Sequence, residues 1–165
     1  INSLSAGGEV DLIVRKLNQL VAEGLDFDQV VDVITTYQSK TKLLFVLAKV
    51  DNLVKNGRLS KLIGTVVGLL NIRMVGEASK TGTLELLQKA RGQKKAIKAA
   101  FDELIKAGYA GGHITIAHRN NEKFIEQFSA LVREKFAHAM IEVLPTSGLC
   151  SFYAEEGGLL MGYEI

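Results

Sequence analysis

The stretch "KKAIKAAFDELIKAGYAGGHITIAHRNNEKFIEQFSALVREKFAHAMIEVLP", residues 94–145, alternates between two hydrophobic periods. Its apolar residues recur at helical spacing in 94–107 and again in 121–136. In contrast, "GHITIAH" (112–118) and "AMIEVLP" (139–145) have the patterns of strands. Each strand therefore follows a helix, and this alternation is typical of an α/β domain in which helices pack against a sheet.

Further strands are predicted on both sides of this stretch. "KLLFVLA" (42–48) is a continuous apolar run of the kind expected for a strand buried on both faces, although a core helix segment would also fit. "IRMVGEA" (72–78) and "TLELLQKA" (83–90) are predicted to form a hairpin around "SKTG" (79–82), and "LLMGYE" (159–164) reads as the last strand. A hairpin added to the helix–strand alternation predicts an α/β fold with a mixed sheet and flanking helices.

The first half of the chain is predicted to contain more helices. Residues 9–23 have an amphipathic helical pattern, and Asp26 with Gln29 has the spacing of a capping box that begins a second helix. Within "VDNLVKNGRLSKLIGTVVGLL" (50–70), a short helix is predicted to stop near Gly57, and another helix follows it.

The composition narrows the class of protein. With 165 residues, of which 47% are hydrophobic and 23% charged, the chain can bury one ordinary core. Its single cysteine excludes an internal disulfide and fits a reducing compartment, so we predict the cytoplasm. The formal charge of +2 is too small to indicate a nucleic acid partner, and no apolar run is long enough for a transmembrane segment. Because the sequence begins at Ile1 without a methionine, we expect an upstream portion.

Catalytic and metal-binding patterns are not found in this sequence. His113 and His118 lie five positions apart on a predicted strand, so their side chains point to opposite faces and cannot share a metal ion. Ser147 lacks the glycine two positions earlier that a nucleophile elbow requires. Cys150 lies in an apolar stretch, where a thiol usually behaves as a small buried hydrophobe. We therefore predict no catalytic residue, no metal and no cofactor.

A basic segment begins one of the predicted helices. Lys94 and Lys95 fall in its first turn, where the helix macrodipole disfavours cations. Together with Arg91 and the unpaired amide hydrogens of the helix start, they would suit a phosphate or an acidic protein surface. A solvated basic face is the simpler alternative. Nucleic acid is disfavoured, because no aromatic residues lie between these charges.

Two long segments share a specific order of short motifs. They are "VDNLVKNGRLSKLIGTVVGLLNIRMV" (50–75) and "KTGTLELLQKARGQKKAIKAAFDEL" (80–104), and their order is Gly-Arg, a helix, Leu-Asn-Ile and then Arg-Gly-x-Lys-Lys-Ala. In this order they resemble the C-terminal portion of a DegV-family fatty-acid-binding protein. The opening "INSLSAGGEVDLIV" (1–14) resembles the family's Asp-Ser stretch, with Asn2 in place of the aspartate. These segments span nearly the whole chain.

The resemblance implies a two-lobed α/β protein that encloses one long-chain fatty acid between its lobes. It also implies that the acyl carboxylate is presented to a separate fatty acid kinase, so the protein itself would not be an enzyme. Residues 1–48 would then be a remnant of the first lobe, and residues 49–165 would be the C-terminal lobe. Two alternatives remain, a protein-interaction module and a small enzyme with a polar ligand.

The resemblance also implies site residues. Arg58 matches the arginine of the family's Gly-Gly-Arg segment and would face the head group, unless it forms a surface salt bridge. Arg91 matches an arginine on the kinase-facing surface, which would give Arg91, Lys94 and Lys95 a partner. The candidate walls of the acyl cavity, which are equally explained as helix core, are Val66, Val67, Leu70 and Ile72.

The C-terminal segment departs from the family. The family closes its site with His-x-Gly-Pro-Gly, where this chain has Tyr153-Ala154-Glu155-Glu156-Gly157. Tyr153 is predicted to donate a hydrogen bond to the head group in place of the histidine. Two carboxylates would repel a fatty-acid head group, so Glu155 and Glu156 are predicted to point away from it, in a solvated turn. This departure leaves open a neutral or cationic amphiphile, or no ligand.

Overall fold

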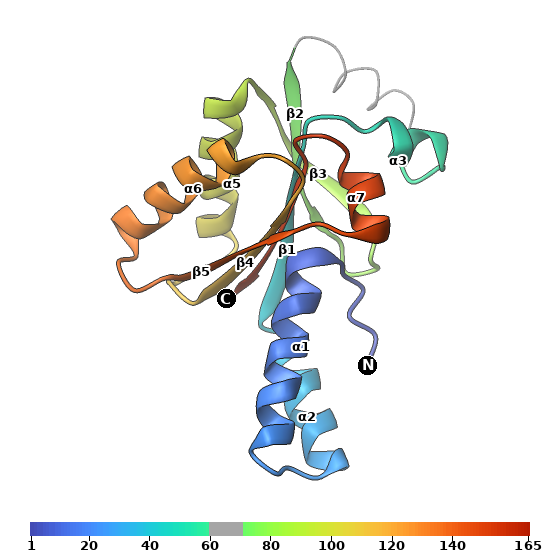
Figure 1. Ribbon diagram of the computed structural model, residues 1–165, viewed down its shortest axis with the longest axis vertical. Helices are drawn as coiled ribbons and strands as arrows, with labels where there is room; N and C mark the ends of the chain where they lie inside the picture. Colours follow the sequence, from blue (N-terminus) through green and yellow to red (C-terminus); the bar gives the residue numbers. More distant parts are fainter. Residues whose placement is uncertain (60–70) are drawn as a thin grey trace.

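The computed structural model describes residues 1–59 and 71–165, which form one six-stranded sheet with helices on both faces (Figure 1). The strands are β1 (Thr41–Leu47), β2 (Ile72–Ala78), β3 (Leu84–Arg91), β4 (His113–His118), β5 (Met140–Pro145) and β6 (Leu159–Glu164). The helices are α1 (Gly7–Ala22), α2 (Phe27–Gln38), α3 (Asp51–Lys55), α5 (Gln93–Lys106), α6 (Glu122–Lys135) and α7 (Gly148–Ala154).

The sheet is mixed, as predicted. Its strand order is β3-β2-β1-β6-β4-β5. Strands β4 and β5 run parallel and are connected through α6, whereas the pairs β1–β2, β1–β6, β2–β3 and β4–β6 run antiparallel. A parallel pair requires a crossover and an antiparallel pair accepts a hairpin, which explains why both connection types occur in the sequence.

Strand β1 lies near the middle of the sheet and is buried on both faces. Its side chains alternate, so Leu44 and Val46 join one hydrophobic cluster. Leu43, Phe45 and Leu47 join a second cluster on the other face. The strand interpretation of residues 42–48 is therefore confirmed, and the alternative of a core helix is wrong.

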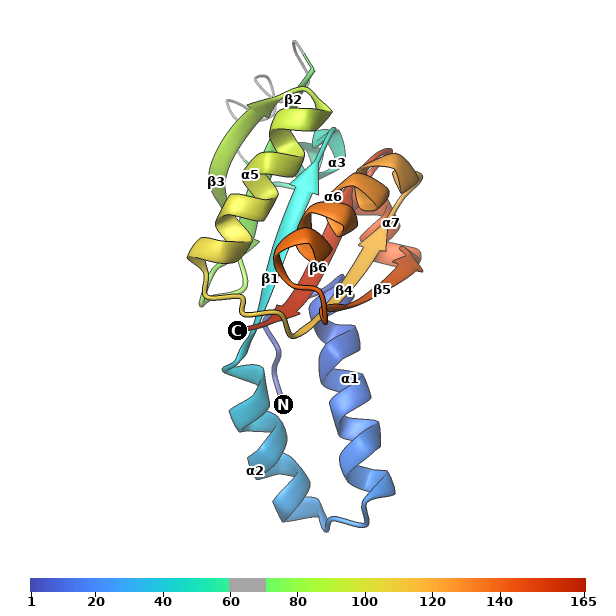
Figure 2. The ribbon, with the colours of Figure 1, turned by 90° about the vertical axis from the view of Figure 1, so that its left-hand side faces the viewer.

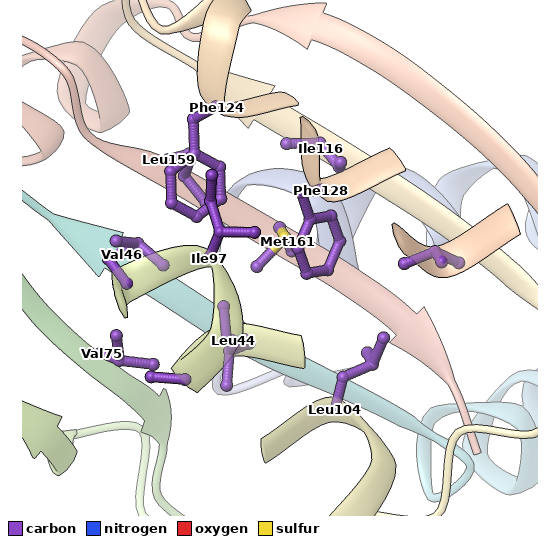
Figure 3. Close-up of a cluster of buried hydrophobic side chains, with 14 of the residues drawn as sticks. Leu44, Val46, Val75, Ile97, Leu104, Ile116, Phe124, Phe128, Leu159 and Met161 are labelled. Carbon is purple, nitrogen blue, oxygen red and sulfur yellow. The ribbon is translucent and has the colours of Figure 1, made fainter. Parts of the chain in front are cut away.

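Helices α5 and α6 cover the first face. Figure 3 shows side chains of both helices meeting those of the sheet, among them Phe124 and Phe128 of α6 and Met161 of β6. The two phenylalanine rings are stacked with their centroids 6.1 Å apart. This cluster is the main core of the described chain.

Helices α3 and α7 lie on the other face of the sheet, opposite α5 and α6 (Figure 1). Helices α1 and α2 form a hairpin that extends beyond the end of the sheet (Figure 2). Ile13 and Leu20 of α1 pack there against Val30 and Ile34 of α2. The predicted capping box of α2 is confirmed, because the Asp26 side chain accepts a hydrogen bond from the Gln29 amide at 2.9 Å.

The lobe boundary predicted after residue 48 concerns a longer, two-lobed protein, so it stays a prediction. Within this chain, β1 pairs with both β2 and β6. Residues 41–47 therefore share one core with the residues that follow position 48. The helix that was predicted to follow Gly57 falls in 60–70, outside the described residues.

Helix α1 reaches the sheet through a close contact between glycines. A methyl group added to Gly162 of β6 would lie 2.2 Å from the amide nitrogen of Glu9, which belongs to the backbone of α1. We expect Gly162→Ala to lower the free energy of unfolding by about 1 to 3 kcal/mol, because a backbone must move to relieve the clash. Urea denaturation would measure this loss.

Gly112→Ala is the matched control. A methyl group there would first meet the side-chain carboxylate of Glu164, at 2.8 Å, so a side chain held by hydrogen bonds from Tyr37 and His113 must shift, but no helix backbone must move. We expect the loss for Gly112→Ala to be the smaller of the two. Equal losses would contradict the importance of the α1–β6 contact.

Candidate functional site

A cavity of about 610 Å³ lies on the face of the sheet that carries α3 and α7. Its floor consists of Leu43, Phe45 and Leu47 from β1 and Leu160 from β6. These residues point into the cavity because the alternating side chains of β1 place every second residue on this face. The remaining walls come from α3, α7, the β2–β3 hairpin and the N-terminal segment, and include Ser3, Ser5, Leu53, Ala78, Thr81, Thr83, Leu84, Leu149, Cys150 and Tyr153.

Polar side chains line the cavity on two sides. Arg58 and Tyr153 lie on the side of α3 and α7. Hydroxyl groups lie on the side of the hairpin and the N-terminal segment, where Thr81 and Thr83 bond to Ser79 at 3.0 and 2.7 Å. Between them the lining is mostly aliphatic and aromatic. A mainly apolar cavity with few polar groups suits an amphiphilic ligand.

Arg58 and Tyr153, which were both predicted at the head group, are brought into contact. The Nε of Arg58 donates a hydrogen bond to the Tyr153 hydroxyl at 3.0 Å, and its guanidinium carbon lies 5.1 Å from the centre of the tyrosine ring. Since the hydroxyl accepts from Arg58, its own hydrogen remains available for another acceptor. The pair can therefore offer an anion one neutral donor and the remaining N–H groups of a cation.

Arg58 is held in place by the end of α3. The Arg58 amide donates to the carbonyl of Leu53 at 2.8 Å, and the Gly57 amide donates to the carbonyl of Val54 at 3.1 Å. This is a Schellman motif, which needs a left-handed residue after the helix, and Gly57 supplies it with a φ of 68°. The predicted helix stop near Gly57 is confirmed.

Tyr153 is positioned by α7, a helix that the sequence did not reveal. Helix α7 has only seven residues, too few to show a helical period. Leu149 and Cys150 lie four and three positions before Tyr153, so all three share the side of the helix that lines the cavity. The partly buried Cys150 packs there against the apolar cluster, in agreement with its interpretation as a small hydrophobe.

Glu155 and Glu156 point away from the cavity, but the prediction of a solvated turn is wrong for Glu155. The partly buried Glu155 carboxylate accepts a hydrogen bond from the backbone amide of Asn52 at 2.8 Å. Glu156 is exposed, lies 3.8 Å from Arg119 and accepts a hydrogen bond from Asn120 at 3.2 Å. The prediction failed because residues 52 and 155 are far apart in sequence and meet only in the fold.

Only one of the four predicted wall residues lies in the described part of the chain. Val66, Val67 and Leu70 fall outside the described residues, and Ile72 begins β2 without lining the cavity. The actual floor was missed, although its residues were recognised as a buried strand. A run that is buried on both faces does not indicate which face meets helices and which meets a cavity.

Arg91, Lys94 and Lys95 lie together and are exposed, as their spacing predicted. Arg91 ends β3, and the two lysines occupy the first turn of α5. Gly92 precedes this helix and offers no side-chain cap. Across residues 1–59 and 71–165, no ion pair engages any of the three cations.

Neither metal ligands nor a membrane span is found in the described part of the chain. No group of three or more potential ligand side chains could hold a metal ion there. His118 accepts a hydrogen bond from the Asn121 amide at 3.2 Å, whereas His113 lies 3.6 Å from Glu142. Among the described helices, none has both the length and the apolar character needed to cross a bilayer.

Comparison with known proteins identifies close relatives. A DegV domain-containing protein of Streptococcus gordonii is 77% identical over all 165 residues, which cover 59% of that relative. The crystal structure of the Streptococcus pneumoniae Fatty Acid Kinase (Fak) B3 protein loaded with linoleic acid matches with a TM-score of 0.98 and 76% identity, over 100% of this chain and 59% of that one. A DegV family protein from Eubacterium eligens loaded with heptadecanoic acid matches with a TM-score of 0.95 and 35% identity, over 99% of this chain and 59% of its own.

The family assignment rests on nearly the whole sequence. The chain spans 59% of the length of these relatives. A sequence model described as "Uncharacterised protein, DegV family" matches residues 1–163. The chain belongs to the DegV family.

Proposed function

We propose that this chain forms part of a binding site for a long-chain fatty acid, and that the full-length protein presents the acyl carboxylate to a separate fatty acid kinase. The observation that carries the proposal is the apolar cavity with Arg58 and Tyr153 at its edge. The relatives loaded with linoleic and heptadecanoic acid support the same ligand class. The protein would act in the cytoplasm as a carrier, without catalysis or a metal.

The size and lining of the cavity support an acyl ligand. A volume of about 610 Å³ falls within the usual range for small-molecule sites. Each buried methylene contributes about 0.8 kcal/mol, so the walls of such a carrier need apolar residues more than reactive groups. The rival interpretation, an enzyme with a small polar substrate, would favour a compact polar pocket that includes Glu155 and Glu156. These side chains contact Asn52 and Arg119 instead.

The proposed head-group site pairs one neutral donor with one cation. The Tyr153 hydroxyl donates a hydrogen bond without the cost of burying a charge. We expect Tyr153→Phe to weaken the binding of an ionised fatty acid by about 1.5 to 3 kcal/mol, as for other hydrogen bonds to charged groups. Isothermal titration of the full-length protein would measure this loss.

Tyr37→Phe serves as the control for this prediction. Tyr37 donates its hydroxyl hydrogen to Glu164 at 2.7 Å and does not line the cavity. Its replacement should leave fatty acid affinity unchanged. A Tyr153→Phe variant that binds as tightly as the parent would exclude Tyr153 from the head-group site.

We propose that Arg91, Lys94 and Lys95 dock the kinase. Three exposed cations with no ion pair among the described residues would attract an acidic surface and accelerate association. Reversing all three charges should lower the association rate with the kinase by about tenfold or more at low salt, and should remove its salt dependence. Stopped-flow or surface-plasmon measurements at several salt concentrations would test this.

A variant with the same change in net charge provides the control. It reverses three exposed cations of α6, namely Lys123, Arg133 and Lys135. Equal losses of association rate in both variants would indicate a general charge effect. Arg91, Lys94 and Lys95 would then be a solvated basic face and not a docking site. Fatty acid affinity should be unchanged in both variants.

A further inference from the structure

We propose that Glu155 and Asn52 are positioning residues for the Arg58–Tyr153 pair, and that they thereby set the affinity for an anionic head group. This inference rests on the proposed function of the cavity. Glu155 and Asn52 do not line the cavity. They act by fixing α3, which precedes Arg58, relative to α7, which carries Tyr153.

Helix α3 depends on contacts outside itself. It has only five residues, and Val50 at its N-cap offers no side-chain hydrogen bond. So short a helix is not stable alone in water, and its first amides need an acceptor. The Glu155 carboxylate supplies one for the Asn52 amide at 2.8 Å. A carboxylate at this position also interacts favourably with the positive end of the helix dipole.

Asn52 makes a second connection to α7. Its side-chain amide donates to the carbonyl of Phe152 at 2.8 Å. One residue of α3 therefore holds both the end of α7 and the residue that follows it. Together, the hydrogen bonds from Asn52 to Glu155 and to Phe152 fix the position of the start of α3 relative to α7.

The other end of α3 completes a closed ring of contacts. The Schellman motif at Gly57 fixes the backbone of Arg58 to α3, and the Arg58 side chain returns to Tyr153 on α7. The ring runs from Tyr153 through Glu155 and Asn52 to Arg58 and back. Removing the Glu155 carboxylate takes away one of the two hydrogen bonds between α3 and α7 and leaves only the bond from Asn52 to Phe152, so the position of Arg58 relative to Tyr153 is fixed less firmly.

The backbone of Glu155 supports a specific use of its side chain. Its φ is 53°, in the left-handed region where glycine is favoured and a residue with a Cβ is strained. Two glycines, Gly157 and Gly158, follow closely. Glycine would suit the backbone of this position better than glutamate. The hydrogen bond from the Asn52 amide at the start of α3 gives the Glu155 side chain a role that glycine could not fill.

The experiment uses the full-length protein and two ligands of equal chain length, linoleic acid and linoleyl alcohol. We expect Glu155→Ala to weaken linoleate binding about tenfold or more, since the partly buried Asn52 amide loses its charged acceptor and the donors of the site lose their alignment. Binding of the alcohol, which has no charge to be recognised, should change less than threefold. Glu155→Gln keeps an oxygen acceptor for Asn52 and should restore linoleate affinity.

Two further variants separate positioning from general damage. Glu156→Ala removes the neighbouring carboxylate, whose contacts are Arg119 and Asn120, and should leave both affinities unchanged. In a Tyr153→Phe background, Glu155→Ala should cause a smaller additional loss than it causes alone, because both changes disrupt one unit. Equal losses for acid and alcohol, or fully additive losses, would overturn the inference.

A ligand-free measurement distinguishes this inference from the proposed function. With ¹³C-labelled tyrosine, the ring signal of Tyr153 should shift in Glu155→Ala, remain near its parent position in Glu155→Gln and remain unchanged in Glu156→Ala. An unmoved Tyr153 signal in Glu155→Ala would overturn positioning even if the parent binds linoleate. A parent that binds neither ligand, with the Tyr153 shift present, would instead defeat the proposed function and the head-group role.

Discussion

Phe128→Ala should lower the free energy of unfolding by about 3 to 5 kcal/mol, as large-to-small changes at buried aromatic positions usually do. Phe128 is fully buried on α6 and stacks on Phe124, with the ring centroids 6.1 Å apart. It also packs against the face of the sheet that carries Leu44 and Met161 (Figure 3). Truncation removes the apolar contacts and leaves a cavity that the surrounding strands cannot close.

Urea denaturation followed by circular dichroism would measure this effect, with Phe27→Ala as the matched control. Phe27 begins α2 and its side chain is 80% exposed, so its removal should change stability by less than about 0.5 kcal/mol. A loss below about 1 kcal/mol for Phe128→Ala would contradict the assignment of this cluster as the main core.

Ala78→Trp is expected to weaken fatty acid binding by about two orders of magnitude. Ala78 ends β2, is partly buried, and lines the cavity beside the hairpin. An indole at this position would occupy space that the acyl chain needs, while a strand accommodates an aromatic side chain well. Exclusion of about four methylenes, at about 0.8 kcal/mol each, corresponds to a loss of about 3 kcal/mol in binding free energy.

Ala110→Trp is the control for the cavity variant, because it adds the same indole at an exposed position away from the cavity. Fatty acid titrations of both variants in the full-length protein would make the comparison. We expect normal affinity for Ala110→Trp. Normal affinity for Ala78→Trp, with the protein folded, would show that the acyl chain does not occupy this cavity.

The regular elements of the sheet could be predicted because their patterns are local. Strands β2 and β6 have the predicted bounds, 72–78 and 159–164, and the helix predicted at 94–107 is α5, Gln93–Lys106. Each has either a long helical period or an apolar run that is bounded by turn residues. In contrast, α7 was missed because Gly148–Ala154 is too short to show a period, and its N-cap Ser147 is followed three positions later by Cys150 instead of the Glu or Gln of a capping box.

The site was predictable only in part. Arg58 and Tyr153 are head-group residues only as a prediction from the resemblance, and their hydrogen bond joins residues that are 95 positions apart, so no local pattern encodes it. The same holds for Glu155 and Asn52, which are 103 positions apart. The cavity floor depends on which face of β1 the helices leave uncovered, and that is a property of the whole sheet.

Mass spectrometry of the lipid that is extracted from the full-length native protein is the most direct test of the proposed ligand. The account predicts one long-chain fatty acid per protein molecule, released on denaturation and reduced in the Ala78→Trp variant but retained in Ala110→Trp. An extract without any fatty acid, together with no increase in the melting temperature when long-chain fatty acids are added, would contradict it.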